Sequence, residues 1–126
     1  MENKWNNRTI LIAEDEDSNY KYLEIALRKS GINIFRAKNG NEAINLVKEH
    51  SEIELILMDI KMPEKNGLEA TREIKQIRED LPIIALTAYA MANDREMSLE
   101  AGCDDYISKP VRQNRIYSVL SKFLNE

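Results

Sequence analysis

Acidic residues stand directly after two of the chain's short apolar runs. The run "TILIA" (9–13) leads into "EDED", which begins with Glu14 and Asp15, and the run "LILM" (55–58) delivers a single carboxylate, Asp59. Carboxylates that share one site repel each other, and each raises the cost of ionising the rest unless a cation joins them. Oxygen ligands select a hard divalent ion, and Mg2+ is the natural candidate because it keeps waters that a phosphate can replace.

Two further apolar runs also end in residues that can do chemistry. Thr87 follows "PIIAL" (82–86), and Lys109 follows "DYIS" (105–108). A phosphoryl group held between a cation, the Lys109 ammonium and the Thr87 hydroxyl is placed for attack by a carboxylate oxygen of Asp59. The product would be an aspartyl phosphate, a known class of covalent intermediate.

Short apolar runs alternate with longer stretches at helical spacing, and this alternation predicts an α/β fold. At least three runs lack polar residues at alternate positions, as expected for parallel strands that are covered on both faces. The predicted strands are 9–13, 33–37, 55–58, 82–86 and 105–108. The predicted helices cover Tyr20 to Leu27, Ala43 to Val47, Ala70 to Ile77, residues 91–101, and Ile116 to Leu124.

Five strand–helix pairs give a (βα)5 count. In an open parallel sheet, ligands bind outside the carboxyl ends of the strands, at the point where the strand order reverses. If the first and third strands are neighbours, Glu14, Asp15 and Asp59 converge in one crevice. Thr87 and Lys109 then line its other side, and we expect Asp59 to be presented at the mouth of the crevice rather than buried.

The size and composition of the chain fit one soluble domain. A chain of 126 residues can bury roughly two-thirds of its unfolded surface around a single core. The net charge is −4 and the basic residues are scattered, so we expect no nucleic-acid binding through this domain. Cys103 is a single cysteine, and the N-terminal apolar run is too short for a signal peptide or membrane span, so a cytoplasmic protein is expected. We expect an N-terminal tail at 1–7 and a domain at 8–126.

Four motifs in this chain follow the order and spacing of a known family. With "AEDED", "MDIKMPEKNG", "ALTAYA" and "DDYISKP", the chain resembles a receiver domain of two-component response regulators over nearly its whole length. The resemblance implies a flavodoxin-like three-layer sandwich with a parallel five-stranded sheet of order 2-1-3-4-5. It implies that Asp59 is the phospho-acceptor. It also implies that Asp15 ligates Mg2+ directly, that Glu14 does so directly or through water, and that the backbone carbonyl of Lys61 is a further ligand.

The same resemblance implies a switch pair, Thr87 and Tyr106, in which the hydroxyl moves toward the phosphoryl group and the aromatic ring turns inward. Lys109 would pair with phosphoryl oxygens, and the Lys109–Pro110 bond would be cis. Tyr89 is expected to screen the site from attacking water. The surface that changes is expected on the fourth helix, the fifth strand and the fifth helix.

The implied partners are proteins. The phosphoryl donor would be a histidine kinase or a histidine phosphotransfer protein, and the output would pass to a downstream target or an attached domain. Because the acceptor is the protein itself, we expect no enzyme that turns over an external substrate. The segments "ALTAYAMANDRE" and "AGCDDYISKPV" favour a receiver of a hybrid kinase over a stand-alone one.

Other functions share parts of this pattern. A flavodoxin-like cofactor binder needs a hydroxyl- and glycine-rich phosphate loop after its first strand, whereas this strand ends in four acids. An aspartate-based phosphohydrolase generally has a second acid two residues after its nucleophile, where this chain has Lys61. A receiver-like module that binds proteins without being phosphorylated is the remaining alternative.

Overall fold

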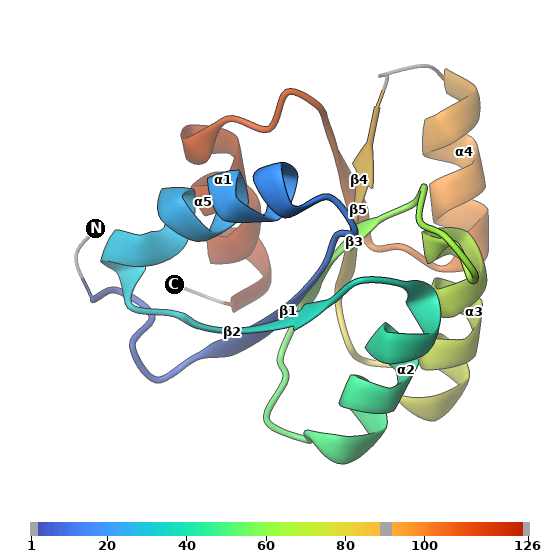
Figure 1. Ribbon diagram of the computed structural model, residues 1–126, viewed down its shortest axis with the longest axis horizontal. Helices are drawn as coiled ribbons and strands as arrows, with labels where there is room; N and C mark the ends of the chain where they lie inside the picture. The colour runs from blue at the N-terminus through green and yellow to red at the C-terminus, as the bar shows by residue number, and fades with distance from the viewer. Residues whose placement is uncertain (1–2, 89–91, 125–126) are drawn as a thin grey trace.

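A five-stranded parallel sheet runs through the middle of the molecule (Figure 1). The computed structural model describes residues 3–88 and 92–124, with the side chains of 92–94 excepted. The strand order is β2-β1-β3-β4-β5, so the predicted α/β class and strand order are confirmed. The strands are β1 (Thr9–Ala13), β2 (Asn33–Ala37), β3 (Ile56–Asp59), β4 (Ile83–Thr87) and β5 (Asp105–Ser108).

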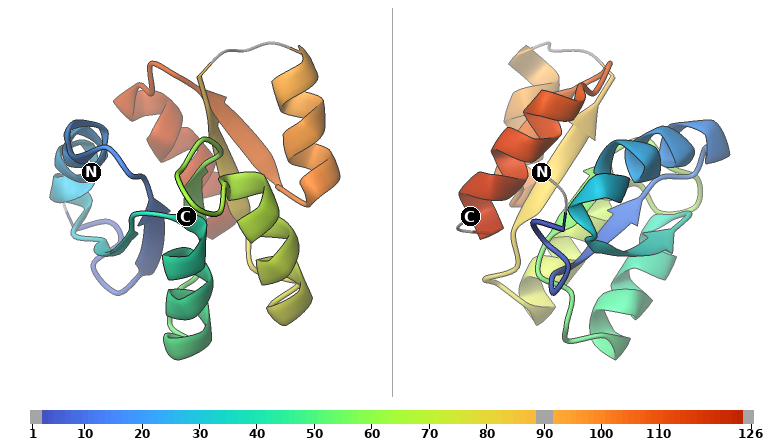
Figure 2. Two further views of the ribbon diagram at one scale, coloured as in Figure 1. Left: turned by 45° about the vertical axis from the view of Figure 1, so that its right-hand side comes forward. Right: turned by 90° about the vertical axis from the view of Figure 1, so that its left-hand side faces the viewer.

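Helices cover both faces of this sheet, which makes a three-layer structure. α1 and α5 lie on one face, and α2, α3 and α4 lie on the other (Figures 1 and 2). The helices are α1 (Asp17–Leu27), the short 3-10 helix η1 (Arg28–Ser30), α2 (Gly40–Glu49), α3 (Gly67–Ile77), α4 (Ala92–Ala101) and α5 (Gln113–Leu124). The predicted helices are confirmed, although α1, α2, α3 and α5 each begin three residues before the first apolar residue of the predicted spacing. Residue 91, where the fourth helix is predicted to begin, lies outside the described residues.

The three central strands are almost completely buried, whereas the edge strands β2 and β5 are partly exposed. This difference confirms that the uninterrupted apolar runs belong to strands covered on both faces. β3 and β4 each end one residue later than predicted. The reason is that Asp59 and Thr87, although polar, still pair in the ladder, with Leu86 and Ser108 respectively.

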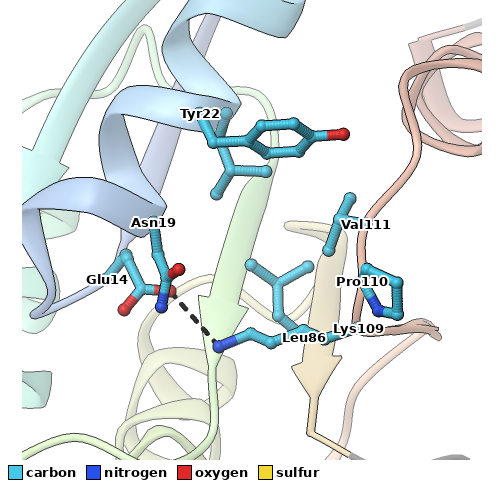
Figure 3. Close-up of a pocket in the computed structure, with 8 residues that line it drawn as sticks. Glu14, Asn19, Tyr22, Leu86, Lys109, Pro110 and Val111 are labelled. Carbon is cyan, nitrogen blue, oxygen red and sulfur yellow. Dashed lines mark hydrogen bonds and ion pairs between the residues drawn. The ribbon is translucent and has the colours of Figure 1, made fainter.

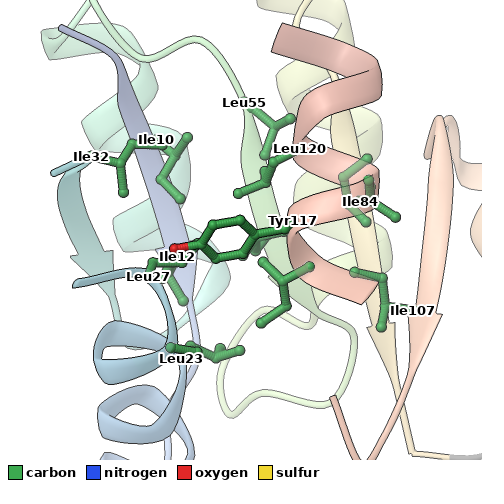
Figure 4. Packing of buried hydrophobic residues seen from close by; sticks show 14 of the residues in the cluster. Ile10, Ile12, Leu23, Leu27, Ile32, Leu55, Ile84, Ile107, Tyr117 and Leu120 are labelled. Carbon is green, nitrogen blue, oxygen red and sulfur yellow. The ribbon is translucent and has the colours of Figure 1, made fainter. Parts of the chain in front are cut away.

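Each face of the sheet has its own apolar core. Between the sheet and helices α1 and α5, Tyr117 of α5 points toward β1 and α1 among aliphatic side chains, including Ile12 and Leu27 (Figure 4). The opposite core lies under α2 and α3 and includes Met58, Ile74 and the sulfur of Cys103. Cys103 is a free cysteine and is buried in this core.

The segment before β1 packs against the first of these cores. Trp5 is completely buried, and its ring lies 5.2 Å from the ring of Tyr117 between centroids. The Trp5 amide donates to the carbonyl of Ser30 (2.8 Å), and Lys4 Nζ donates to Ser121 Oγ (3.1 Å). Through these contacts the N-terminal segment connects η1 to α5. The expected boundary between residues 7 and 8 stays a prediction.

Candidate functional site

Three carboxylates converge where β1 and β3 end. Oxygens of Glu14, Asp15 and Asp59 all lie within 4.8 Å of one another. β1 and β3 are hydrogen-bonded neighbours, so residues just beyond their last rungs meet at one edge of the sheet. The Glu14 amide donates to the carbonyl of Ala37 (2.9 Å), which continues the β1–β2 pairing by one residue and holds Glu14 in place. The predicted convergence of these three acids is therefore seen in the structure.

The chain turns tightly after Asp59 and returns into α3. A Cβ atom on Gly67 would lie only 2.3 Å from the Asp59 carbonyl oxygen, so this close approach requires glycine. Asn66 begins α3 through a capping box: its side chain accepts from the Glu69 amide (2.9 Å), and the Glu69 side chain accepts from the Asn66 amide (3.2 Å). The close approach of Gly67 and the capping box at Asn66 together hold the chain in place just after Asp59.

The acids are more enclosed than the sequence indicated. Glu14 is completely buried and Asp59 is only 5% exposed. The expectation that Asp59 is presented rather than buried is therefore wrong, and the Lys109 side chain lies against its carboxylate, with Nζ 3.6 Å from Oδ2. Burial, and next the charge of Asp59, raise the pKa of Glu14 to about 7, and burial raises the pKa of Asp59. Proteins keep such acids close together mainly where a cation shares them.

Lys109 reaches into the crevice from the other side. Its Nζ lies 3.5 Å from Glu14 Oε1 and 3.6 Å from Asp59 Oδ2 (Figure 3 shows the contact with Glu14). The predicted cis bond between Lys109 and Pro110 is present. The Lys109 amide donates to the carbonyl of Thr87 (2.7 Å), so the last residues of β4 and β5 stay paired to the edge of the site. One cation thus contacts two of the three acids.

Thr87 lies at this edge with its side chain almost completely buried. Among the described residues, its Oγ1 has no hydrogen-bond partner. A buried hydroxyl without a partner is costly, and such groups are often found where a ligand or a conformational change satisfies them. Tyr106 is half-buried on β5, and the guanidinium of Arg95 lies 5.6 Å from the centre of its ring. Tyr89 lies outside the described residues.

Lys61 lies beside the Asp59 carboxylate. Its backbone amide donates to Asp59 Oδ1 (3.1 Å), while its side chain is exposed. This hydrogen bond favours the charged form of Asp59 and partly offsets the effect of burial on its pKa.

The donor set fits a hard divalent cation. Three carboxylates at the ends of β1 and β3 offer oxygen atoms only, and the pKa values of Glu14 and Asp59 are raised, chiefly by burial. Magnesium sites in proteins use a few carboxylates and leave positions for water or phosphate oxygens. The residues present therefore suit Mg2+, and no cluster of this kind with histidine or cysteine ligands occurs among the described residues.

Arg36 is a neighbour of the site that the sequence did not single out. It lies on β2 and contacts the loop that carries Glu14 and Asp15. The only unusual feature of Arg36 in the sequence is its charge inside the run "NIFRA", which otherwise suits a partly covered strand. That feature does not distinguish an edge strand's solvent-facing position from a functional contact.

A cavity of about 350 Å3 opens beside Lys109, between α1 and the segment that follows β5 (Figure 3). Apolar side chains provide most of its lining. The lining residues are Glu14, Asn19, Tyr22, Leu23, Leu86, Lys109, Pro110 and Val111.

The sequence matches a known protein family over most of its length. The model of the response regulator receiver domain matches residues 10–121, which include every acid and strand end described above. The chain belongs to the response regulator receiver domain family. The receiver therefore has the phospho-accepting pocket of that family, formed here by Glu14, Asp15 and Asp59.

Relatives of the receiver include single proteins and parts of larger ones. It is 39% identical to the polar-differentiation response regulator DivK of Brucella anthropi over 121 residues, which cover 94% of this chain and 98% of that protein. It is 34% identical, with a TM-score of 0.87, to the receiver domain of a sensor histidine kinase of Pseudomonas aeruginosa, a structure with magnesium in its active-site cleft. That likeness covers 94% of this chain and 98% of the other.

A third likeness concerns a complex. The receiver domain of the Saccharomyces cerevisiae regulator Ssk1, crystallised with the histidine phosphotransfer protein Ypd1, is 33% identical, with a TM-score of 0.87. That likeness covers 92% of this chain and 88% of the other. Among the helices that the structure describes, none is long and apolar enough to cross a bilayer.

Proposed function

We propose that this receiver accepts a phosphoryl group on Asp59 from a phosphohistidine in a Mg2+-dependent reaction. The observation that carries the proposal is the position of Asp59: it is enclosed with two further acids on one side and Lys109 Nζ at 3.6 Å on the other. Because Oδ1 of Asp59 is held by the Lys61 amide, the carboxylate has a fixed orientation. In-line phosphoryl transfer depends chiefly on such positioning and on neutralisation of charge.

The chain's own residues have distinct parts in this reaction. Glu14, Asp15, Asp59 and the Lys61 carbonyl would hold Mg2+, which neutralises phosphate charge when bound. A carboxylate oxygen of Asp59 forms a bond to phosphorus, and the phosphorus–nitrogen bond of the donor breaks. The electron pair stays on the imidazole nitrogen, which then takes a proton. The Lys109 ammonium neutralises phosphoryl oxygens, and the buried Thr87 hydroxyl donates to one of them.

The donor is proposed to be a histidine kinase or a histidine phosphotransfer protein. The apolar cavity beside Lys109 supports a protein donor, because its lining includes Tyr22 of α1, an aromatic side chain that is 50% exposed. Apolar surface of this kind next to a reactive group is typical of a docking site. The Ssk1–Ypd1 complex shows that a similar domain forms such a pair.

The signal is proposed to leave through α4, β5 and α5. Phosphorylation would draw Thr87 toward the phosphoryl group, and Tyr106 would move into the space that this leaves. Support comes from the Thr87 hydroxyl, which has no hydrogen-bond partner among the described residues, and from the exposed apolar residues Met97 and Leu99 on α4, which are 43% and 44% exposed. We propose further that the protein acts in the cytoplasm and turns over no external substrate.

The experiment that tests the function is the intact mass after incubation with acetyl phosphate, with and without Mg2+. The wild type is expected to gain one phosphoryl group only with Mg2+, and Asp59→Asn is expected to gain none. Asp80→Asn is the matched control, because Asp80 is an exposed acid far from the crevice, beside the start of β4, and this variant should still be phosphorylated.

Beryllofluoride, a stable mimic of the phosphoryl group, covers the case of a short phosphoryl lifetime. A folded wild type that binds Mg2+ but gains neither mass nor beryllofluoride would favour a module that binds proteins without phosphorylation. Equal gain by Asp59→Asn would contradict the assignment of Asp59.

A further inference from the structure

The loop that carries two of the metal-site acids is held by one arginine from the neighbouring strand. Arg36 on β2 pairs with Ile12 of β1 in the sheet. Ile12 lies two residues before Glu14, so Arg36 is close to the loop that carries the acids. Its side chain is only 19% exposed, although arginine on an edge strand usually extends into solvent. The side chain instead turns toward the β1–α1 loop.

The contacts of Arg36 are mostly with backbone atoms. Its Nε and Nη2 donate to the Glu14 carbonyl at 3.3 and 3.1 Å, and its Nη2 lies 3.4 Å from the Asp15 carbonyl. Nη2 also forms an ion pair with Asp17 Oδ1 at 2.9 Å. The guanidinium carbon lies 4.4 Å from the centre of the Tyr20 ring, on the first turns of α1. One side chain therefore connects β2, the acid loop and α1.

This loop is where unfavourable charge is concentrated. Residues 14–17 are four consecutive acids, and the carboxylates of the first two face Asp59. Mutual repulsion would drive the Glu14 and Asp15 side chains apart before a cation binds. Lys109 contacts Glu14 and Asp59. No contact of Lys109 with Asp15 is present in the part of the chain that the structure describes.

We propose that Arg36 is a positioning residue for the metal site, a role that rests on the proposed function above. By binding the carbonyls of Glu14 and Asp15, it holds the backbone in the one arrangement in which both side chains face Asp59. Residues that support metal ligands in this way are often as influential as the ligands, since their loss weakens metal affinity by about 10- to 100-fold.

The geometry explains why this position suits arginine. A guanidinium offers several donors in a rigid plane, so it can bind two adjacent carbonyls and a carboxylate at once while stacking on an aromatic ring. A lysine has the same charge but no such fork. The Arg36→Lys variant therefore separates the charge of the side chain from its ability to hold the loop.

The direction of the change in Mg2+ affinity tests the proposal. A positive charge near a cation site weakens cation binding by repulsion, so removing the charge without any other effect would strengthen Mg2+ binding. Loss of positioning has the opposite effect. In isothermal titration calorimetry with Mg2+ alone, we expect Arg36→Met to bind about tenfold more weakly than the wild type, and Arg36→Lys to bind more weakly as well.

Arg8→Met is the matched control. Arg8 also combines an ion pair, with Glu54 at 2.7 Å, and a hydrogen bond to a backbone carbonyl, that of Leu124 at 2.8 Å, but it lies before β1 at the opposite end of the sheet. We expect this variant to lose stability in thermal unfolding while keeping wild-type Mg2+ affinity. A general loss of stability would affect both arginine variants alike, whereas a positioning role changes Mg2+ affinity only at Arg36.

Three results would overturn the proposal: Mg2+ binding by Arg36→Met that equals or exceeds that of the wild type, full wild-type affinity in Arg36→Lys, or an equal loss in Arg8→Met. If Arg36→Met does not fold, Arg36→Lys decides. A wild type that binds no Mg2+ and gains no phosphoryl group would overturn the proposed function, and this role with it. A wild type that does both, with variants of unchanged affinity, would overturn the role of Arg36 alone.

Discussion

The crevice has an acid side, at the ends of β1 and β3, and a hydroxyl side, at the ends of β4 and β5, and the two are built differently. On the acid side, the carboxylates of Glu14 and Asp59 accept hydrogen bonds from the backbone amides of Glu16 and Lys61, both at 3.1 Å. Arg36 binds the carbonyls behind them. The acid side is therefore held in position before any ligand arrives.

On the hydroxyl side, the Thr87 Oγ1 atom is buried without a partner among the described residues. The neighbouring helix α4 separates polar and apolar residues poorly: Ser98 is buried, whereas Met97 and Leu99 are exposed. A helix whose described side chains divide so poorly between an apolar buried face and a polar exposed face is weakly held. The comparison indicates that one side of the crevice holds a ligand by preorganisation while the other is free to change when the ligand arrives.

The largest expected effect is on Mg2+ affinity, which should depend on the acid side of the crevice and not on the hydroxyl side. Asp15→Asn should weaken Mg2+ binding by roughly 100-fold, because it replaces a charged ligand of the cation with a neutral one. Thr87→Val should change it by less than about threefold, since the hydroxyl side supplies no metal ligand. Calorimetric titration with Mg2+ measures both, with Asp80→Asn as the control for a general loss of acidity. Equal losses in the Asp15 and Thr87 variants would contradict the division.

The next effect concerns pH. The pKa of Glu14 is raised from 4.5 to about 7 in the folded protein, so the folded state binds this proton more tightly than the unfolded chain does. Its contribution to stability is therefore complete below about pH 4.5 and is lost as the pH rises through 7. Without Mg2+, the free energy of unfolding should fall by about 2 kcal/mol over this range, relative to Glu14→Gln.

Urea unfolding of the wild type and Glu14→Gln at pH 5 and pH 8 measures this difference. Saturating Mg2+ should reduce it, because a bound cation favours the ionised acid and binds only the folded state. If the free energy of unfolding depends on pH in the same way in both proteins, the pKa of Glu14 is not raised in the folded state and the prediction is wrong.

A smaller effect is expected on the hydroxyl side. Thr87→Val keeps the shape of the side chain and removes a buried hydroxyl that has no partner, so it should raise the free energy of unfolding by about 1 kcal/mol. Phosphorylation with acetyl phosphate should persist at a reduced rate. A Thr87→Val protein that is less stable than the wild type would show that the hydroxyl is satisfied before phosphorylation, for instance by an ordered water.

The smallest effect tests how weakly α4 contributes to the fold. Met97→Gln should change the free energy of unfolding by less than about 0.5 kcal/mol, because the side chain is 43% exposed. Ile74→Ala, on α3 in the same layer, is the contrast: Ile74 is completely buried, and its loss should cost about 3 kcal/mol. Denaturant unfolding measures both. A large loss for Met97→Gln would mean that α4 is firmly packed.

Much of this arrangement could be predicted because apolar runs report burial directly. Apart from Thr9, the runs that became β1, β3 and β4 are apolar, and the polar residue that follows each run marks the edge of the sheet. Since all strands are parallel, those edges coincide, which brought Glu14, Asp59 and Thr87 together without any knowledge of tertiary contacts.

The rest depended on contacts that the sequence pattern does not report. Asp59 is buried beside Lys109, a residue far along the chain, and the role inferred for Arg36 depends on a side chain that turns toward the β1–α1 loop. Trp5 lies among polar residues in "MENKWNN", where no periodicity indicates a buried face. Its burial follows from contacts with Ser30 of η1 and Tyr117 of α5, which form only in the folded protein.

That buried indole gives the molecule an optical probe of its own. Trp5 is the only tryptophan of the chain, and its Nε1 is enclosed without a hydrogen-bond partner among the described residues. Its fluorescence should therefore be blue-shifted in the native protein and should shift to the red on unfolding. Because the indole contacts Tyr117 of α5, a change in its emission when Asp59 is phosphorylated would report that α5 has moved, with no label attached.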